Sequence, residues 1–225
     1  MRMRLKKHLE ERIADCQNIL LVREGDNFFR LTEQQKMEFM RTPQQIFGND
    51  NPLYLELGCG KGTFAIKSAE QNADVNYIAL EKLSNVIVVG CEDAIACGVT
   101  KNLRFLNIRA ENLHYHLPQH SVERIYLNFS CPFPKKTYAN RRLTSKNFLN
   151  MYRGLLTENG EIWQKTDNKT FFEYSIESLT ENGYQVFDIN TDLPADFEGN
   201  VVTEYESKFR ALGQPIYALK AKLVK

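Results

Sequence analysis

The chain has 225 residues, of which 43% are hydrophobic and 25% charged, as in a globular domain of ordinary size. Its 29 Lys and Arg residues nearly balance 28 Asp and Glu residues, so the net charge of +1 excludes a strong overall attraction to polyanions and leaves RNA binding to local patches. No apolar run approaches the roughly 20 residues that cross a bilayer, and the basic N-terminus leads into charged residues rather than an apolar stretch. We therefore expect a cytoplasmic protein without a membrane segment.

The cysteines contain no CxxC pair, and no histidine stands at metal-ligand spacing from them. This pattern predicts free thiols, no disulfide framework and no metal site. The five residues are Cys16, Cys59, Cys91, Cys97 and Cys131.

Residues 1–50 are polar and are predicted to form a helical extension with a basic start, which has no core of its own. The basic residues at this start are Arg2, Arg4, Lys6 and Lys7. We expect the extension to lie against the sheet or over the active site.

From residue 53 onward, short β-type runs alternate with helical stretches. The predicted strands are 53–57, 77–80, 103–106, 124–129, 161–165, 184–189 and 216–223. The predicted helices are 63–71, 85–96, 145–156 and 171–179. This alternation predicts an α/β fold in which a doubly wound, mostly parallel sheet of seven strands carries helices on both faces.

The most informative segment, residues 55–64, is a hydrophobic strand that runs into three alternating glycines and then a helix. Gly58, Gly60 and Gly62 allow the backbone to turn sharply and to approach a ligand where a Cβ would collide. Glu56 stands two residues before the first glycine, and Glu81 ends the next predicted strand. A carboxylate at the position of Glu81 can accept hydrogen bonds from both ribose hydroxyls of a nucleoside.

Three nucleotide ligands compete for this turn. A P-loop needs GxxxxGK[ST], and here a glycine follows Lys61, so that reading fails. A dinucleotide site prefers GxGxxG, whereas the spacing is GxGxG and Glu56 would repel a pyrophosphate. The same acid suits the cationic methionine moiety of S-adenosylmethionine, which is therefore favoured over NAD. A glycine turn that only permits tight packing is the remaining alternative.

The segment 128–136 follows the strand predicted at 124–129. Open α/β sheets bind ligands beyond the carboxyl ends of their strands, so we expect this segment to face the donor methyl. Pro132 and Pro134 stiffen the loop around Phe133, and two lysines follow directly. This arrangement is expected where a flat base is held beside a phosphate backbone, although a rigid surface loop with exposed lysines would look the same. The basic patch comprises Lys135, Lys136, Arg141 and Arg142.

Taken together, these segments resemble the bacterial tRNA (guanine-N7)-methyltransferases over nearly the whole chain. The resemblance is carried by residues 1–4, 47–52, 56–62, 126–130, 134–136, 141–144, 165–168, 198–206 and 213–217. It implies a single Rossmann-like methyltransferase domain over residues 51–225, after the extension over residues 1–50. It also implies S-adenosylmethionine as the methyl donor, no metal, and the variable-loop guanosine of tRNA as the substrate, for a monomer or a homodimer.

The resemblance also implies roles for single residues. The donor would be bound by Glu56, Gly58, Gly60, Glu81, Asn107 and Arg109. The guanosine or its surroundings would be contacted by Lys135, Asp167, Thr203, Glu204, Tyr205 and Glu206, with Lys136, Arg141 and Arg142 as an RNA patch. Thr203, with Glu206 three residues later, is equally typical of an ordinary helix cap.

The chain departs from the family pattern in two places. Cys131 stands where the family has an acidic residue in its catalytic loop, and Phe133 and Tyr138 replace a tryptophan and a histidine. Arg109 stands where a donor-binding acid is expected, so the adenine contact there would be shared with Asn107 or backbone amides. A nucleophilic Cys131 is disfavoured because guanine N7 needs no covalent activation. Methylation of an exocyclic amine, or a donor-binding RNA-binding protein with little turnover, are the alternative functions.

Overall fold

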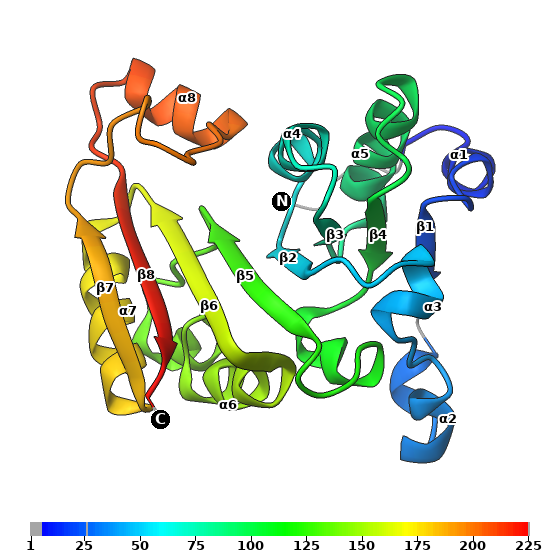
Figure 1. Ribbon diagram of the computed structural model, residues 1–225, viewed down its shortest axis with the longest axis horizontal. Coiled ribbons are helices and arrows are strands. Elements are labelled where there is room, and N and C mark those ends of the chain that lie inside the picture. The colour runs from blue at the N-terminus through cyan, green and yellow to red at the C-terminus, as the bar shows by residue number, and fades with distance from the viewer. Residues whose placement is uncertain (1–5, 26, 225) are drawn as a thin grey trace. The chain divides into compact units, whose positions relative to one another are not determined.

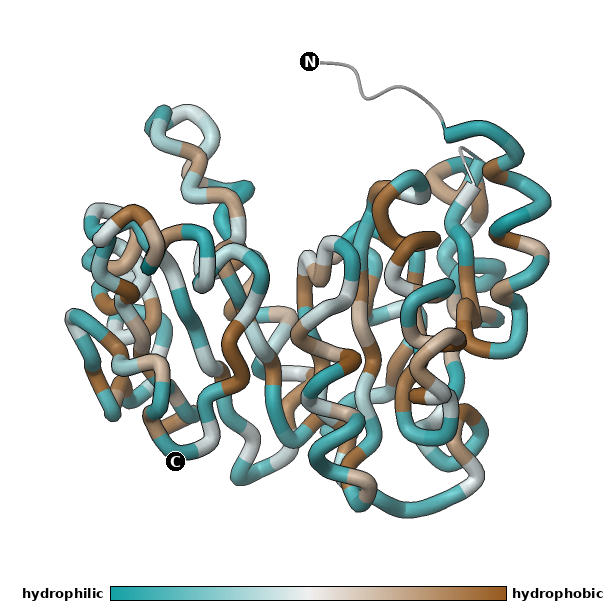
Figure 2. The backbone as a smooth tube through the Cα atoms, turned by 90° about the horizontal axis from the view of Figure 1, so that it is seen from above, coloured by the Kyte–Doolittle hydropathy of each residue, from teal (hydrophilic) through white to brown (hydrophobic). Residues whose placement is uncertain are grey.

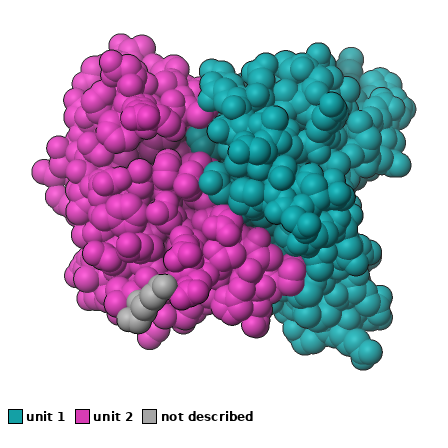
Figure 3. All heavy atoms as spheres, in the orientation of Figure 1, with its two compact units in different colours: residues 1–117 teal, residues 118–225 magenta. Residues whose placement is uncertain are grey.

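The structure is a computed structural model that describes residues 6–25 and 27–224. The chain divides into two compact units, Met1–Leu117 and Pro118–Lys225, which Figure 3 colours separately. Two residues of the predicted basic start, Arg2 and Arg4, lie outside the described residues.

The N-terminal part of the first unit contains short helices, as predicted, and one strand that was not predicted. The elements are α1 (Leu9–Asp15), β1 (Leu20–Arg23), the 3-10 helix η1 (Phe28–Arg30), α2 (Glu33–Met37) and α3 (Pro43–Phe47). Thr32 and Thr42 begin α2 and α3 with reciprocal capping boxes, in which the glutamine three residues later bonds back to the threonine N–H. The strand was missed because its four residues are too few to show an alternating hydrophobic pattern. The domain boundary at residue 50 stays a prediction.

The sheet of the first unit is entirely parallel, in the order β1-β4-β3-β2 (Figure 1). Its other strands are β2 (Leu53–Leu57), β3 (Asn76–Leu80) and β4 (Leu103–Asn107), connected through α4 (Thr63–Gln71) and α5 (Ser84–Ala96). The 3-10 helix η2 (Ala110–Tyr115) follows β4. All five residues of β3 are buried, as expected for a central strand of a parallel sheet.

The second unit has strand order β5-β6-β8-β7, in which β5 and β6 are parallel and β8 runs antiparallel to both of its neighbours. Its strands are β5 (Val122–Asn128), β6 (Leu156–Thr166), β7 (Tyr184–Asn190) and β8 (Tyr217–Leu223). Its helices are η3 (Lys136–Arg141), α6 (Lys146–Leu155), α7 (Lys169–Glu181) and α8 (Glu204–Ala211). Figure 1 shows α6 and α7 behind these strands, and α7 packs against β6, β7 and β8.

The α/β class and the mostly parallel strands are confirmed, and every predicted strand and helix is present within a few residues of its predicted ends. The strand number is corrected from seven to eight in the described residues, because β1 adds a strand beside β4. Figure 2 shows short hydrophobic stretches separated by hydrophilic ones along the chain. Within residues 6–25 and 27–224, no helix combines the length and apolar character needed to cross a bilayer.

Helix α5 packs unusually close to the glycine-rich turn after β2. A Cβ built on Gly90 of α5 would lie 2.7 Å from the carbonyl oxygen of Lys61 and 3.2 Å from the Phe105 ring. Gly62 has φ of 72°, and its Cβ would lie 2.9 Å from the same ring. Since the obstacle at Gly90 is backbone rather than a flexible side chain, this helix position requires glycine.

Replacing Gly90 by alanine is therefore expected to lower the free energy of unfolding by about 1–3 kcal/mol, because α5 or the turn must move. Denaturant unfolding measures the effect. The control is Gly154→Ala on α6, where a Cβ meets no atom within 4 Å and the helix propensity of alanine should leave stability unchanged or up to about 1 kcal/mol higher. Equal destabilisation by both substitutions would contradict the packing argument.

Candidate functional site

The glycine turn of the first unit joins β2 to α4 through three left-handed residues. Gly58, Gly60 and Gly62 have φ values of 77°, 58° and 72°. The N–H groups of Gly58 and Cys59 both donate to the carbonyl oxygen of Leu80, at 2.8 and 2.9 Å, which fastens the turn to the end of β3. A Cβ on Gly58 or Gly60 would meet no protein atom within 4 Å, so these glycines are needed for their backbone conformation and leave room for a ligand.

Two acidic residues lie around this turn. Glu56 is buried near the end of β2, and Glu81 directly follows β3, whose pairing with β2 places Leu80 opposite Leu57. Burial and then the negative charges of Glu56 and Glu81 raise the pKa of the Cys59 thiol well above its ordinary value. Both carboxylates are therefore near the Cys59 side chain, and two acidic residues at one turn favour a cation over a phosphate as a ligand.

Asn107 connects the ends of β3 and β4. Its side-chain amide donates to the carbonyl oxygen of Glu81 at 2.8 Å, and its side-chain oxygen accepts from the Ser84 hydroxyl at 2.6 Å. The side chain is buried and is used within the protein on both sides. It braces the loop that carries Glu81, while direct contact with adenine stays a prediction.

Arg109, the residue at the family's acidic position, is exposed at the exit of β4. Its backbone N–H donates to the carboxylate of Glu24 at 3.1 Å. The sequence offered no reason to select Glu24, because it lies far from this loop in the chain and is brought to it by the pairing of β1 with β4.

The loop after β5 in the second unit is held in a strained shape. Phe129 and Phe133 have φ values of 49° and 41°, which non-glycine residues seldom adopt. Arg142 donates to the carbonyl oxygens of Pro132 and Phe133 at 3.0 and 3.1 Å, and its guanidinium lies 4.2 Å from the ring centre of Tyr174. Arg142 therefore braces the loop, and its predicted contact with RNA stays a prediction.

Other residues of this loop present their side chains to solvent. Cys131 is an exposed free thiol, and Lys135, Lys136 and Arg141 are also exposed. The Arg141 guanidinium lies 4.6 Å from the ring centre of Tyr138. The exposed cations and the aromatic ring form a surface suited to a phosphate backbone and a base.

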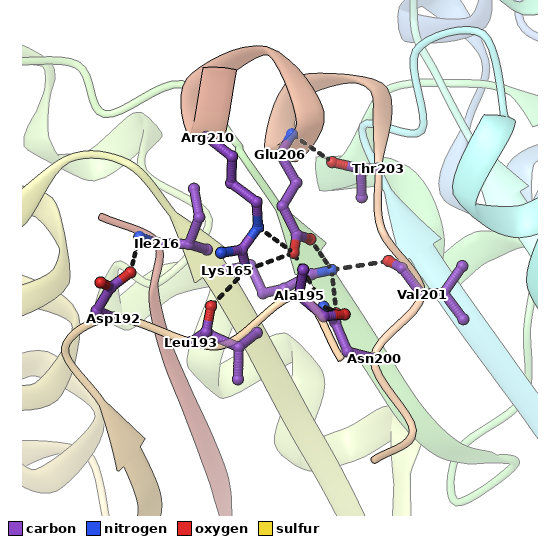
Figure 4. A network of polar contacts seen from close by, with 10 residues as sticks. All are labelled: Lys165, Asp192, Leu193, Ala195, Asn200, Val201, Thr203, Glu206, Arg210 and Ile216. Atoms are coloured by element: carbon purple, nitrogen blue, oxygen red, sulfur yellow. Dashed lines mark hydrogen bonds and ion pairs between the residues drawn. The ribbon is translucent and has the colours of Figure 1, made fainter. Parts of the chain in front are cut away.

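A buried carboxylate organises the segment before and within α8 (Figure 4). Glu206 has no exposed surface and accepts hydrogen bonds from Lys165 at 2.7 Å, Asn200 at 2.9 Å and Arg210 at 2.8 Å. Lys165, at the end of β6, also donates to the side chain of Asn200 and to the carbonyl oxygen of Val201, both at 2.9 Å. The network thus ties α8 and the preceding loop to the sheet of this unit.

The charge of Glu206 is stabilised within this network. Burial alone would raise the pKa of Glu206, but the charge and hydrogen bond of Lys165, with hydrogen bonds from Asn200 and Arg210, outweigh burial and hold the pKa below its ordinary value. The Thr203 hydroxyl accepts from the Glu206 N–H at 2.9 Å, which confirms the predicted helix cap. The Glu206 carboxylate bonds to Lys165, Asn200 and Arg210 rather than back to the Thr203 N–H, so this cap is not a reciprocal capping box.

The predicted substrate segment 203–206 is divided by burial. Thr203 and Glu206 are buried, whereas Glu204 and Tyr205 are exposed. The Tyr205 ring stacks near Phe129, with centroids 6.2 Å apart and planes 20° apart. Within the second unit the structure therefore brings Tyr205 to the loop after β5. Asp167, directly after β6, is partly exposed.

Sequence reasoning gave no role to Gly90, Lys165 or Arg210. A glycine inside the helix at Gly90 was an available signal, as was the spacing of four residues between Glu206 and Arg210. Lys165 could have been noticed as a cation in a predicted core strand. Among the described residues, no group of three or more His, Cys, Asp or Glu side chains is arranged to hold a metal ion.

Comparison with known proteins identifies the family of this chain. The family described as "Putative methyltransferase" matches residues 50–219. A tRNA (guanine-N(7)-)-methyltransferase of Lysinibacillus sphaericus is 40% identical over 225 residues, covering 100% of this chain and 99% of the relative. The chain belongs to the tRNA (guanine-N7)-methyltransferase family. A member from Bacillus velezensis is 47% identical over 173 residues, covering 76% of this chain and 79% of the relative.

Solved structures share the fold of this family member at low sequence identity. The 16S rRNA methyltransferase KamB is 16% identical, with a TM-score of 0.58 over 91% of this chain and 96% of that chain. A SAM-dependent methyltransferase from Aquifex aeolicus is 12% identical, with a TM-score of 0.56 over 89% of this chain and 100% of that chain. These likenesses establish a Rossmann-like methyltransferase fold.

Replacing Glu206 by glutamine is expected to lower the free energy of unfolding at neutral pH by about 3 kcal/mol, because Lys165 loses its buried counter-charge. The folded pKa of Glu206 is lowered, so its stabilising effect is complete above the ordinary value of 4.5 and is lost as the pH falls through the folded pKa. The difference between wild type and Glu206→Gln should therefore narrow as the pH falls below about 4.5.

Denaturant unfolding at several pH values measures this difference. Glu198→Gln, an exposed residue of the same segment, is the matched control and should change stability by less than about 0.5 kcal/mol. A difference that stays constant from neutral to acid pH would show that Glu206 is not an ionised anchor.

Proposed function

We propose that this protein transfers the methyl group of S-adenosylmethionine to N7 of the variable-loop guanosine in tRNA. The main support is an acid-flanked glycine turn in a chain that is 40% identical, from end to end, to a tRNA (guanine-N(7)-)-methyltransferase. The proposal includes residence in the cytoplasm, tRNA as the partner, and a monomer or a homodimer as the working form.

The residues of the first unit fit such a donor. The two acidic residues around the turn, Glu56 and Glu81, suit a ligand with ammonium and sulfonium charges. In this proposal Gly58 and Gly60 give close backbone approach, Glu56 faces the methionine end, and Glu81 accepts from the ribose hydroxyls. When bound, S-adenosylmethionine supplies an electrophilic methyl group.

The residues of the second unit fit the acceptor. Tyr205 offers an exposed ring for stacking on a base, and Lys135 offers a charge for a phosphate. Guanine N7 has a lone pair and no N–H, so the protein needs no general base. It must hold the base in line, exclude water, and tolerate the positive charge that develops on the purine, for which Asp167 is available.

One experiment distinguishes methylation of guanine N7 from methylation of an exocyclic amine. The purified protein is incubated with S-adenosylmethionine and unmodified tRNA, and the digested nucleosides are identified by mass spectrometry. The proposal predicts N7-methylguanosine at a variable-loop position. A nucleoside methylated on an exocyclic amine would replace the proposal by the amine alternative, and donor binding without any methylated nucleoside would favour a binding protein with little turnover.

Cys131 is expected to slow the reaction without preventing it. A carboxylate at this position would stabilise the charge that develops on guanine, and loss of one such group commonly costs about 10- to 1000-fold in rate. Cys131→Asp should therefore methylate tRNA at least as fast as wild type. Cys131→Ala should remain active, because the proposed chemistry does not use the thiol.

Rates are measured with tritiated donor at saturating tRNA, and Cys97→Ala, another exposed free cysteine, is the control. Complete loss of activity in Cys131→Ala, with normal donor binding, would indicate a nucleophilic thiol. Complete loss in Cys131→Asp would contradict the electrostatic role assigned to this position.

A further inference from the structure

Glu24 lies at the end of β1 and is almost fully enclosed. Its side chain is 7% exposed, and that of His116 is 2% exposed. The Glu24 carboxylate accepts from His116 Nε2 at 3.1 Å, from Asn112 Nδ2 at 2.9 Å and from the backbone N–H of Arg109 at 3.1 Å. One carboxylate thus uses both oxygens on a single loop, the one that follows β4.

Further contacts fasten the N-terminal segment to the same loop. The Phe28 ring stacks on His116 with centroids 5.7 Å apart, and Phe39 contacts the same ring edge-on at 5.8 Å. The Tyr115 hydroxyl donates to Glu33 at 2.6 Å, and the Arg41 N–H donates to the carbonyl oxygen of His116 at 3.0 Å. Glu24 itself donates its backbone N–H to the carbonyl oxygen of Asn107 at 3.0 Å.

This loop is where the chain lacks the acid of its family. Arg109 places a cation where the family has a carboxylate, and the Arg109 N–H is already bonded to Glu24. Recognition then falls to other backbone groups of the loop, which bind adenine well only if the loop is held in one conformation before binding. Glu24 contacts this loop at its first, middle and last parts, through Arg109, Asn112 and His116.

We propose that Glu24 is a positioning residue for donor binding, which fixes the loop after β4 so that its backbone can recognise adenine although Arg109 replaces the family's acid. The inference rests on the proposed function, since it concerns how the same donor is held. Glu24 acts through Arg109 and the loop and does not touch the donor.

The test uses S-adenosylhomocysteine and the analogue in which inosine replaces adenosine, so that the base differs only at position 6, where an oxygen replaces the amine, and at N1, which becomes a hydrogen-bond donor. Calorimetry on the full chain gives both dissociation constants. Glu24→Ala should bind S-adenosylhomocysteine about 10-fold more weakly, as expected if the competent loop conformation falls to about a tenth of the population. It should also discriminate less between the two analogues, while the KM for tRNA stays unchanged.

Two further variants separate positioning from general stability. Glu24→Gln keeps an oxygen acceptor for Arg109 and a polar atom beside His116, so binding should return to within about 3-fold of wild type. Glu24→Asp is one methylene shorter and should bind S-adenosylhomocysteine weakly. If the alanine variant does not fold, the aspartate variant is compared with wild type in its place. Glu38→Gln, exposed in the same segment, is the control.

The outcomes distinguish this inference from the function on which it rests. If wild type binds S-adenosylhomocysteine and methylates tRNA, while Glu24→Ala and Glu24→Asp bind both analogues as wild type does, the positioning role is wrong and the function stands. If wild type binds neither analogue, the proposed function fails first. A lower midpoint of thermal unfolding with unchanged analogue discrimination would reduce Glu24 to a structural residue.

Discussion

The pair of acidic residues at the turn after β2 is the constraint on which the proposed donor binding depends. Glu56 and Glu81 stand near the carboxyl ends of neighbouring parallel strands, and Cys59 between them has a raised pKa through burial and both charges. Concentrating two carboxylates around one turn is unfavourable unless a cation offsets them. The turn can come so close to α5 only because Gly90 has no side chain. The same turn therefore depends on close helix packing as well as on its two acidic neighbours.

Each unit uses one buried carboxylate to fix a loop of its candidate site. Glu24 takes three hydrogen bonds from the loop after β4, and Glu206 takes its bonds from Lys165, Asn200 and Arg210 around α8. An enclosed carboxylate is costly unless each oxygen is satisfied, and satisfied it holds its donors in one geometry. Both carboxylates therefore stabilise loop conformation, while the contact of Glu206 with substrate stays a prediction.

The two departures from the family pattern have different chemical consequences. In the proposed function Arg109 concerns how the donor is held, and Glu24 is the proposed compensation, through its hydrogen bond to the backbone of the same residue. In the proposed reaction Cys131 concerns how the developing charge on guanine is stabilised, and Asp167 is an acidic residue that directly follows the neighbouring strand β6. Because guanine N7 attacks without losing a proton, neither substitution removes a group that the proposed chemistry requires.

The sequence by itself determined the α/β class, seven strands, the glycine turn and its two acids, because period and glycine spacing are local properties of the chain. It did not determine β1, whose four residues become a strand only by pairing with β4. It also did not reveal the partners of Glu206 or Glu24, which lie up to 41 and 92 residues away in the chain. Only the tertiary structure decided which carboxylates are buried anchors, because burial and hydrogen-bond partners depend on residues that the fold brings together from distant positions.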